Sequence, residues 1–172
     1  MELIYERSFD EEFFDLESAI AEFGQPILRY CHAMLCDYHE AQDAVQLVFI
    51  KAHSKQNQFK TGTNLSAWLY KIAYSTCLDI LRREKRRIKL VEDLKKQDAQ
   101  TKDSGLPFYL EQALSVLNAK DRALVFSRAV DEMDYSELEG IYGAKAATLR
   151  KRYERAKKKL LHALTEGRDG NE

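Results

Sequence analysis

The sequence predicts an all-α protein built from two small helical domains joined by a flexible linker. Apolar residues recur every three or four positions along most of the chain, which is the period of an amphipathic helix and not of a strand. Two prolines among 172 residues and an apolar fraction of 45% suit a compact helical protein. One polar segment that lacks this periodicity, residues 91–105, divides the chain into two parts.

The first part contains three apolar stripes at helical spacing, within residues 23–35, 41–52 and 65–80. Polar breaks at residues 36–40 and 56–64 separate them, and the second break is rich in Asn, Gln and Thr. Pro26 is expected in an early turn or at a bend of a longer helix. These stripes predict a bundle of three or four helices.

The dividing segment, VEDLKKQDAQTKDSG, is polar, mixed in charge and free of aromatic residues. It lacks the apolar surface that would offset its own ordering entropy, so it is interpreted as a flexible linker. Gly105 and Pro107 end it. The predicted boundaries are residues 1–90 for the first domain, 91–106 for the linker, 107–166 for the second domain and 167–172 for a tail.

The second part carries a helix-turn-helix pattern. Asp134 followed by Glu137 predicts a capping box at the start of a short helix. Gly143 is expected as a left-handed turn residue, and a second helix of about four turns is predicted to open near Lys145. A short helix, a glycine turn and a longer basic helix are typical of proteins that place the second helix in the major groove of DNA.

Charge is strongly polarised along the chain although its formal net value is only −1. Residues 1–22 hold eight acids and one base, residues 82–89 hold six bases and one acid, and residues 145–161 hold eight bases and one acid. Such asymmetry indicates charged partners. The acidic start either lines the solvent face of the first helix or folds back on the basic surfaces, and the first interpretation is favoured.

Both basic segments suit nucleic acid. On the predicted second helix of the motif, Arg150, Lys151, Arg152 and Arg155 fall on the outer arc, where guanidinium groups can reach guanine edges. Residues 157–159 suit phosphates, although lysines also favour a helix C-terminus for its dipole alone. In the first part, Tyr70 and Tyr74 precede the basic run, a combination that suits unstacked bases of single-stranded DNA. Trp68 lies on an apolar stripe and is as well explained as a core residue.

Other classes of function are disfavoured. Cys31, Cys36 and Cys77 follow no usual zinc spacing, so buried reduced thiols are expected and no metal or cofactor is predicted. No apolar run approaches the roughly 18–20 residues that span a bilayer, and the start does not resemble a signal peptide. We therefore expect no membrane insertion. No nucleophile–base pair or paired-carboxylate site stands out, so no catalytic residue is assigned and no enzyme is predicted.

The segment AQDAVQLVFIKA together with FKTGTNLSAWLYKIAYSTCLDILRREKRR resembles region 2 of bacterial RNA polymerase sigma factors of the extracytoplasmic-function type. The segments LEQALSVLNAKDRALVF and DYSELEGIYGAKAATLRKRYERAKKKL are similar to region 4 of the same factors. The resemblance covers residues 12–90 and 108–162. It implies a cytoplasmic bacterial protein that binds core RNA polymerase and promoter DNA, with a linker in the RNA exit path, and that is held inactive by an anti-sigma factor.

The resemblance also implies roles for individual residues. Polymerase contact falls on Asp43, Gln46 and Lys51. Contact with the −10 element falls on Asn57, Lys60, Asn64, Tyr70, Lys71, Tyr74, Arg82 and Arg83. Contact with the −35 element falls on Lys145, Thr148, Arg150, Lys151, Arg152 and Arg155.

Five residues depart from the family pattern. Tyr74 and Ser75 replace the usual Arg-Asn pair, Gln42 replaces Glu, Asn118 stands where Leu-Pro is customary, and Glu139 replaces a small alanine.

Two other functions stay open. One is a helix-turn-helix repressor or activator with a helical effector domain, which would not need the docking helix at residues 41–52. The other is a sigma-like protein that titrates an inhibitor or a polymerase without opening DNA.

Overall fold

The computed structural model describes residues 15–60, 62, 64–92 and 108–169. These residues form seven α-helices and one short 3-10 helix, and no strand occurs among them. The predicted all-α class is therefore confirmed. The elements are α1 (Leu16–Leu35), α2 (Tyr38–Ser54), η1 (Gln56–Gln58), α3 (Leu65–Glu92), α4 (Phe108–Ser115), α5 (Ala119–Ala129), α6 (Tyr135–Tyr142) and α7 (Ala146–Asp169).

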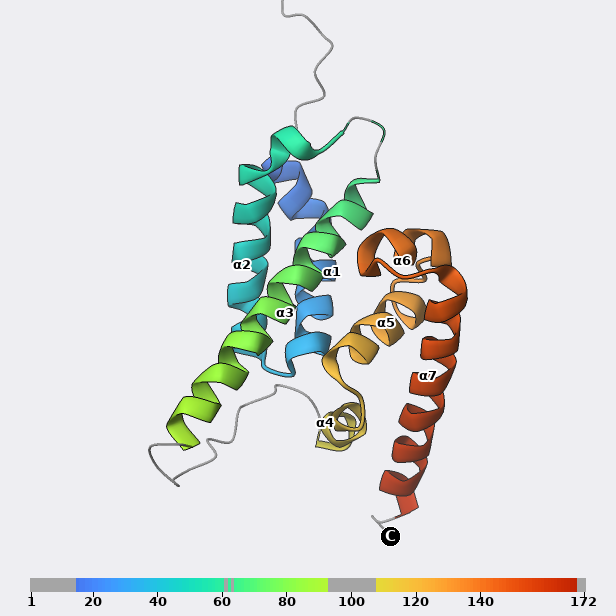
Figure 1. The fold of residues 1–172 in the computed structure, drawn as a ribbon. Coiled ribbons are helices and arrows are strands. Elements are labelled where there is room, and N and C mark those ends of the chain that lie inside the picture. Colours follow the sequence, from blue (N-terminus) through green and yellow to red (C-terminus); the bar gives the residue numbers. More distant parts are fainter. Residues whose placement is uncertain (1–14, 61, 63, 93–107, 170–172) are drawn as a thin grey trace, which may run out of the picture.

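The first half of the molecule is the bundle α1–α3, which matches the expectation of three or four helices (Figure 1). An aspartate caps each of the first two helices: the carboxylate of Asp15 accepts from the Glu17 amide, and that of Asp37 accepts from the Glu40 amide at 2.9 Å. Pro26 lies inside α1, not at its start. Cys36 ends α1 in the left-handed conformation, with φ of 52°.

The second half contains the predicted helix-turn-helix. The capping box of Asp134 and Glu137 is present, and Gly143 ends α6 with φ of 64°. α7 begins at Ala146, as expected near Lys145, but its 24 residues exceed the predicted four turns. Asn118 directly precedes α5, and its side-chain oxygen accepts from the Asp121 amide at 2.9 Å. The residue that departs from the family's Leu-Pro is thus an N-cap.

The two halves pack against each other around one continuous core. Buried residues of α1–α3, such as Ile27, Tyr30 and Leu69, belong to the same apolar cluster as Leu124, Leu138 and Leu149 of the second half. α5 lies against α1, and α6 lies against α3 (Figure 1). α3 continues to Glu92, and the rest of the predicted linker, residues 93–106, lies outside the described residues. The sequence-based domain boundaries stay a prediction.

The long helices α3 and α7 continue past this core. The C-terminal part of α3 extends beyond the ends of α1 and α2, and α7 runs along the other side of the molecule (Figure 1). Among the described residues, no helix is both long and apolar enough to cross a membrane.

Candidate nucleic-acid interface

The N-terminus of α7 is fixed by α6. The carboxylate of Glu139 accepts a hydrogen bond from the amide of Ala146, the first residue of α7. An acidic side chain at this end also favours the helix dipole. Leu149 and Ala156 are buried against the core and set which face of α7 turns outward. The Glu139 that departs from the family pattern therefore caps the second helix of the motif.

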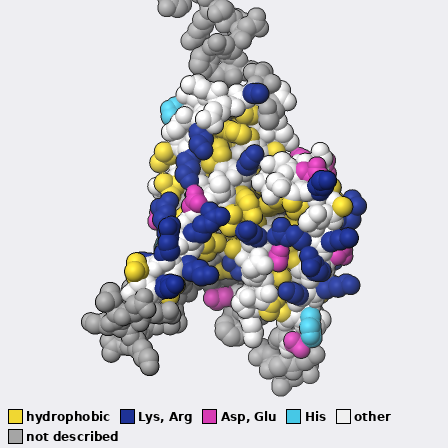
Figure 2. Space-filling model, viewed as in Figure 1, with side chains coloured by type: hydrophobic (Ala, Val, Ile, Leu, Met, Phe, Trp, Pro, Cys, Tyr) yellow, Lys and Arg dark blue, Asp and Glu magenta, His cyan; other side chains and the backbone are white. Residues whose placement is uncertain are grey.

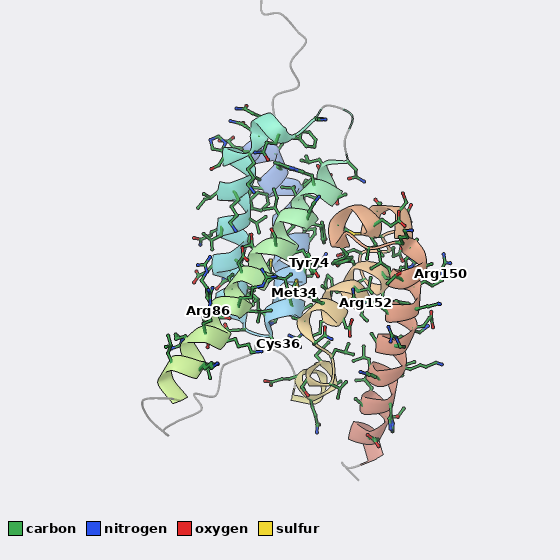
Figure 3. The ribbon with its side chains drawn as sticks, in the orientation of Figure 1. Met34, Cys36, Tyr74, Arg86, Arg150 and Arg152 are labelled. Carbon is green, nitrogen blue, oxygen red and sulfur yellow. The ribbon has the colours of Figure 1, made fainter. Side chains whose placement is uncertain are left out.

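Five of the six residues predicted to contact the −35 element are exposed on α7 or just before it: Lys145, Thr148, Arg150, Lys151 and Arg155. Arg152 differs from the prediction that it lies on the outer arc. Its guanidinium forms an ion pair of 2.9 Å with Asp121 of α5, and only 25% of its side chain is exposed. Figure 3 shows Arg150 directed away from the molecule, whereas Arg152 lies on the side of α7 that faces α5.

The basic segment of α3 is exposed along its whole length. Arg82 pairs with Asp79 at 3.1 Å and Arg87 pairs with Glu84 at 3.0 Å, both within the helix, while Arg83 and Lys71 also face solvent. Figure 2 shows Lys and Arg side chains gathered over the C-terminal part of α3 and along α7 on one face of the molecule. The two basic segments that are distant in sequence therefore share a face.

A groove of about 670 Å³ lies between these two basic helices. α5 contributes its first residues to the groove, and Asp121 is the acidic side chain in its wall. The cations that line it are Lys85, Lys120, Arg152, Arg155 and Lys159. The shared basic face is therefore hollowed between its two helices.

The aromatic residues predicted to contact the −10 element lie in the interface between the two halves. Tyr70 is 2% exposed, and its hydroxyl donates to a carboxylate oxygen of Asp131 at 2.9 Å. The ring of Tyr74 meets the ring of Tyr142 edge-on at 4.8 Å between centroids. In Figure 3 Tyr74 lies where α3 faces the second half. In this arrangement the Tyr70 ring is covered, whereas the Tyr74 ring is partly exposed and packs against Tyr142.

Tyr142 stands at the centre of a partly buried chain of hydroxyl groups that joins the halves. Its hydroxyl shares a hydrogen bond of 3.1 Å with Tyr30 of α1 and one of 2.8 Å with Ser127 of α5. Burial raises the pKa of Tyr30 and of Tyr142 well above the ordinary value for a phenol. All three groups are therefore neutral hydrogen-bonding partners at physiological pH.

Arg122 forms a second tie between the halves. Its guanidinium donates to the carbonyl of Ala33 at 3.0 Å, to that of Met34 at 2.6 Å and to that of Leu117 at 2.7 Å. The first two carbonyls belong to the last turn of α1, where the helix dipole favours a cation. The sequence contains no local pattern that distinguishes Arg122 or Tyr142, because their partners are far away along the chain.

Asn57, Lys60 and Asn64 are exposed in the segment between α2 and α3, and Thr61 and Thr63 lie outside the described residues. Asn64 has two roles in the structure. Its side-chain oxygen accepts from the amide of Ala67 in the first turn of α3, and its amide nitrogen donates to Glu137 of α6 at 3.0 Å. This segment therefore also touches the second half.

On α2, Asp43 and Gln46 are exposed as predicted for a docking surface, next to the exposed apolar side chains of Leu47 and Ile50. Lys51 is placed differently. Its ammonium group donates to the hydroxyl of Thr76 on α3 at 3.0 Å, and Thr76 is 1% exposed. Lys51 thus links α2 to α3.

The three cysteines are free thiols, and Cys31 and Cys77 are buried. A hydrogen bond with Cys77 and burial raise the pKa of the Cys31 thiol. Within the described part of the chain, no group of three or more His, Cys, Asp and Glu side chains is arranged to hold a metal ion.

Residues 19–87 match the family model for sigma-70 region 2. The chain thus contains a sigma-70 region 2 domain, and the curated proteins it resembles are extracytoplasmic-function sigma factors. It is 26% identical over 158 residues to the ECF RNA polymerase sigma factor SigW of Bacillus subtilis, covering 83% of this chain and 84% of SigW. It is 27% identical over 153 residues to SigE of Mycolicibacterium smegmatis, covering 84% of this chain and 59% of that protein.

Solved structures share the fold. The sigma factor RpoE of Bartonella quintana, solved with the anti-sigma factor NepR, superposes with a TM-score of 0.75 at 23% identity, over 88% of this chain and 97% of that one. CnrH, solved with the cytosolic domain of CnrY, superposes with a TM-score of 0.66 at 20% identity, over 91% of this chain and 89% of that one.

Proposed function

We propose that this chain is a sigma factor that binds core RNA polymerase and directs transcription from a particular class of promoters. The observation that carries the proposal is the presence, in one chain, of a sigma-70 region 2 domain and a helix-turn-helix whose second helix exposes cations near its start. In this function the protein acts by binding and not by bond chemistry, in the bacterial cytoplasm.

The −35 element is the target of α7. Arg150, Lys151 and Arg155 are exposed near the start of the helix, which in this motif is the end that approaches base edges. The later lysines of α7 suit phosphate contacts, which position the protein without reading sequence. Arg152 would have to leave Asp121 before it could contact DNA.

The −10 element is the target of α3 and the segment before it. Lys71, Arg82 and Arg83 are exposed in the present arrangement. Tyr70 and Tyr74 would reach unstacked bases only after α6 and α5 move away from α3 and α1. The proposal therefore includes separation of the two halves when the chain docks on polymerase through α2.

Anti-sigma factors are the second expected class of partner. The two structural neighbours were each solved with an anti-sigma factor or its domain. In this chain such a partner would act by keeping the two halves together or by covering α2 and the basic face.

The test is in vitro transcription with purified core polymerase on genomic DNA fragments, followed by mapping of start sites. Expected are start sites that share two conserved elements upstream. Asp43→Ala with Gln46→Ala should weaken polymerase binding, while Glu154→Ala, which changes an exposed polar residue of α7, serves as the matched control. Failure of the chain to bind core polymerase in a pull-down would contradict the proposal and favour a repressor or activator. Binding without start sites or a permanganate-reactive −10 region would favour a titrating protein.

A further inference from the structure

Two guanidinium groups lie over the aromatic ring of Tyr135. It is the first residue of α6, and its ring centroid lies 4.9 Å from Cζ of Arg150 on α7 and 5.5 Å from Cζ of Arg128 on α5. The ring also packs against the core cluster. The start of α6 does not need this side chain, because the capping box of Asp134 and Glu137 already satisfies it.

The two arginines are held in different ways. Arg128 also donates to the carbonyl of Met133 at 3.3 Å, which anchors it to the backbone between α5 and α6. Arg150 is exposed, and its contact within the described residues is the Tyr135 ring. The hollow between these helices is also lined by Glu132 and Glu154, but the structure contains no ion pair between Arg150 and either carboxylate.

A ring contact of this kind preserves what an arginine needs in order to recognise a base. The face of the aromatic ring attracts the guanidinium, while the N–H groups in the guanidinium plane stay available at its edges. Those edges match the O6 and N7 acceptors of guanine. An ion pair uses the same N–H groups, as the Arg152–Asp121 pair does.

Holding the side chain before DNA arrives also reduces the entropy that binding would otherwise remove. Lys151 and Arg155 are exposed on the same helix without a ring contact in the described part of the chain. Lys157 also lies over a ring, that of Tyr153 at 6.0 Å, but it stands about two turns later on α7. Among the described residues, Arg150 is thus the exposed arginine of α7 that a ring contact orients and no carboxylate pairs.

We propose that Tyr135 is a positioning residue for Arg150: its ring holds the guanidinium so that the N–H edges meet a guanine of the −35 element. The proposal rests on the proposed function, since it needs α7 to read that element. It assigns the specificity of one base pair to a residue of the first helix of the motif, which itself does not touch the base.

The experiment uses holoenzyme formed from the full chain and core polymerase, with a promoter found by start-site mapping. Binding is measured to this promoter and to a set of single base-pair substitutions across its −35 element. The variants are Tyr135→Phe, Tyr135→Leu, Arg150→Ala and Tyr135→Leu with Arg150→Ala. Ser136→Ala is the matched control, because Ser136 is the next residue of α6 and is exposed.

Expected are wild-type affinity for Tyr135→Phe, which keeps the ring, and a loss of about three- to tenfold for Tyr135→Leu on the native promoter. On the promoter substituted at the base pair that Arg150 reads, Arg150→Ala should bind as well as wild type. Tyr135→Leu should also show no loss of affinity on that promoter. The double variant should bind as weakly as Arg150→Ala alone, and the slope of affinity against salt should not change. Ser136→Ala should behave as wild type.

Three outcomes are decisive against the inference. If wild-type holoenzyme shows no base-pair preference within the −35 element, α7 does not read that element, and Tyr135 then has no positioning role. If wild-type holoenzyme does show a base preference within the −35 element but Tyr135→Leu binds the promoter as tightly as wild type, the role of Tyr135 alone is overturned. If Tyr135→Leu loses the same affinity on every substituted promoter and has a lower melting temperature, Tyr135 acts only by stabilising the fold.

Discussion

The two parts of α3 differ in what they face. Its first turns carry Tyr70, which is buried and donates to Asp131, and Tyr74, which is partly exposed and packs against Tyr142. Its later turns carry the basic run of residues 82–89, which extends past the bundle and faces solvent. One helix thus exposes its cations near one end and packs these two tyrosine rings against the second half of the molecule near the other.

This difference separates two stages of DNA binding. Phosphate contacts are long-range and can form with the exposed cations while the halves are together. Stacking on bases needs free ring faces, and the interface covers the Tyr70 ring and packs against the Tyr74 ring. Substitutions at the contacts between the halves measure how firmly the interface holds the aromatic part of α3.

The largest effect is expected for Tyr142→Ala. It removes the ring that contacts Tyr74 and leaves the hydroxyls of Tyr30 and Ser127, both fully buried, without their shared partner. The free energy of unfolding should fall by about 3 kcal/mol, as for other large-to-small core changes. Urea denaturation measures it. Tyr142→Phe, which keeps the ring, should lose only about 1–2 kcal/mol.

The same Tyr142→Ala variant should bind a fluorescent single-stranded oligonucleotide more tightly than wild type, because the rings of Tyr70 and Tyr74 become accessible. Unchanged affinity together with the expected loss of stability would mean that these rings do not contact bases. Tyr38→Ala, an exposed ring on α2, is the matched control and should change neither quantity appreciably.

A smaller effect is expected for Arg122→Ala. The variant loses the hydrogen bonds to Ala33 and Met34 that tie α5 to the last turn of α1, and the free energy of unfolding should fall by about 2 kcal/mol. Amide hydrogen exchange should accelerate at the C-terminus of α1. Lys120→Ala, an exposed neighbour, should stay within about 0.5 kcal/mol of wild type. Equal exchange in the two variants would contradict a tie between the halves at this point.

The sequence predicted what depends on neighbours along the chain. The helical periods, the capping box of Asp134 and Glu137, and the left-handed Gly143 are local features, and the structure contains all of them. What it did not predict depends on residues far apart. Asp121 turns Arg152 inward, Thr76 holds Lys51, and the second half covers Tyr70, and no local period or spacing encodes these pairings.

Two of the departures from the family pattern were visible in the sequence but acquired a role only in the structure. Asn118 and Glu139 both provide side-chain oxygens to helix N-termini. Asn118 is followed three residues later by Asp121, whose amide it caps, so a local signal was present there. Glu139 acts across the turn of the motif, seven residues from Ala146, and no capping rule covers that spacing.

Asn64→Ala tests the contact at the start of α3. The variant loses the cap on the Ala67 amide and the exposed hydrogen bond to Glu137, so the free energy of unfolding should fall by about 1 kcal/mol. Asn64→Asp keeps the cap on the Ala67 amide but replaces the NH2 group that donates to Glu137 with a carboxylate oxygen. It therefore tests the contact between the halves separately from the cap. Equal stabilities of Asn64→Asp and wild type would show that the Asn64–Glu137 bond adds nothing.

The smallest effect concerns Asp131, which accepts from Tyr70 in the interface. Burial raises the pKa of this carboxyl above its ordinary value, although the hydrogen bond from Tyr70 and the charge of Arg29 lower it in part. The folded chain therefore holds the proton to a higher pH than the unfolded chain. Stability falls as pH rises from the ordinary aspartate value through the folded one, and it stays lowered at neutral pH.

Asp131→Asn cannot ionise, so its free energy of unfolding relative to wild type should increase as pH rises through that window and then level off. Urea denaturation of both proteins between about pH 3 and about pH 7 measures the difference, in which the titration of the other carboxyls cancels. Asp43→Asn, exposed on α2, should show no such trend. Tyr70→Phe should raise the pKa of Asp131 further, as read by NMR of its carboxyl carbon. A difference between Asp131→Asn and wild type that does not change with pH would show that the Asp131 carboxyl is not in the low-dielectric interface that encloses Tyr70.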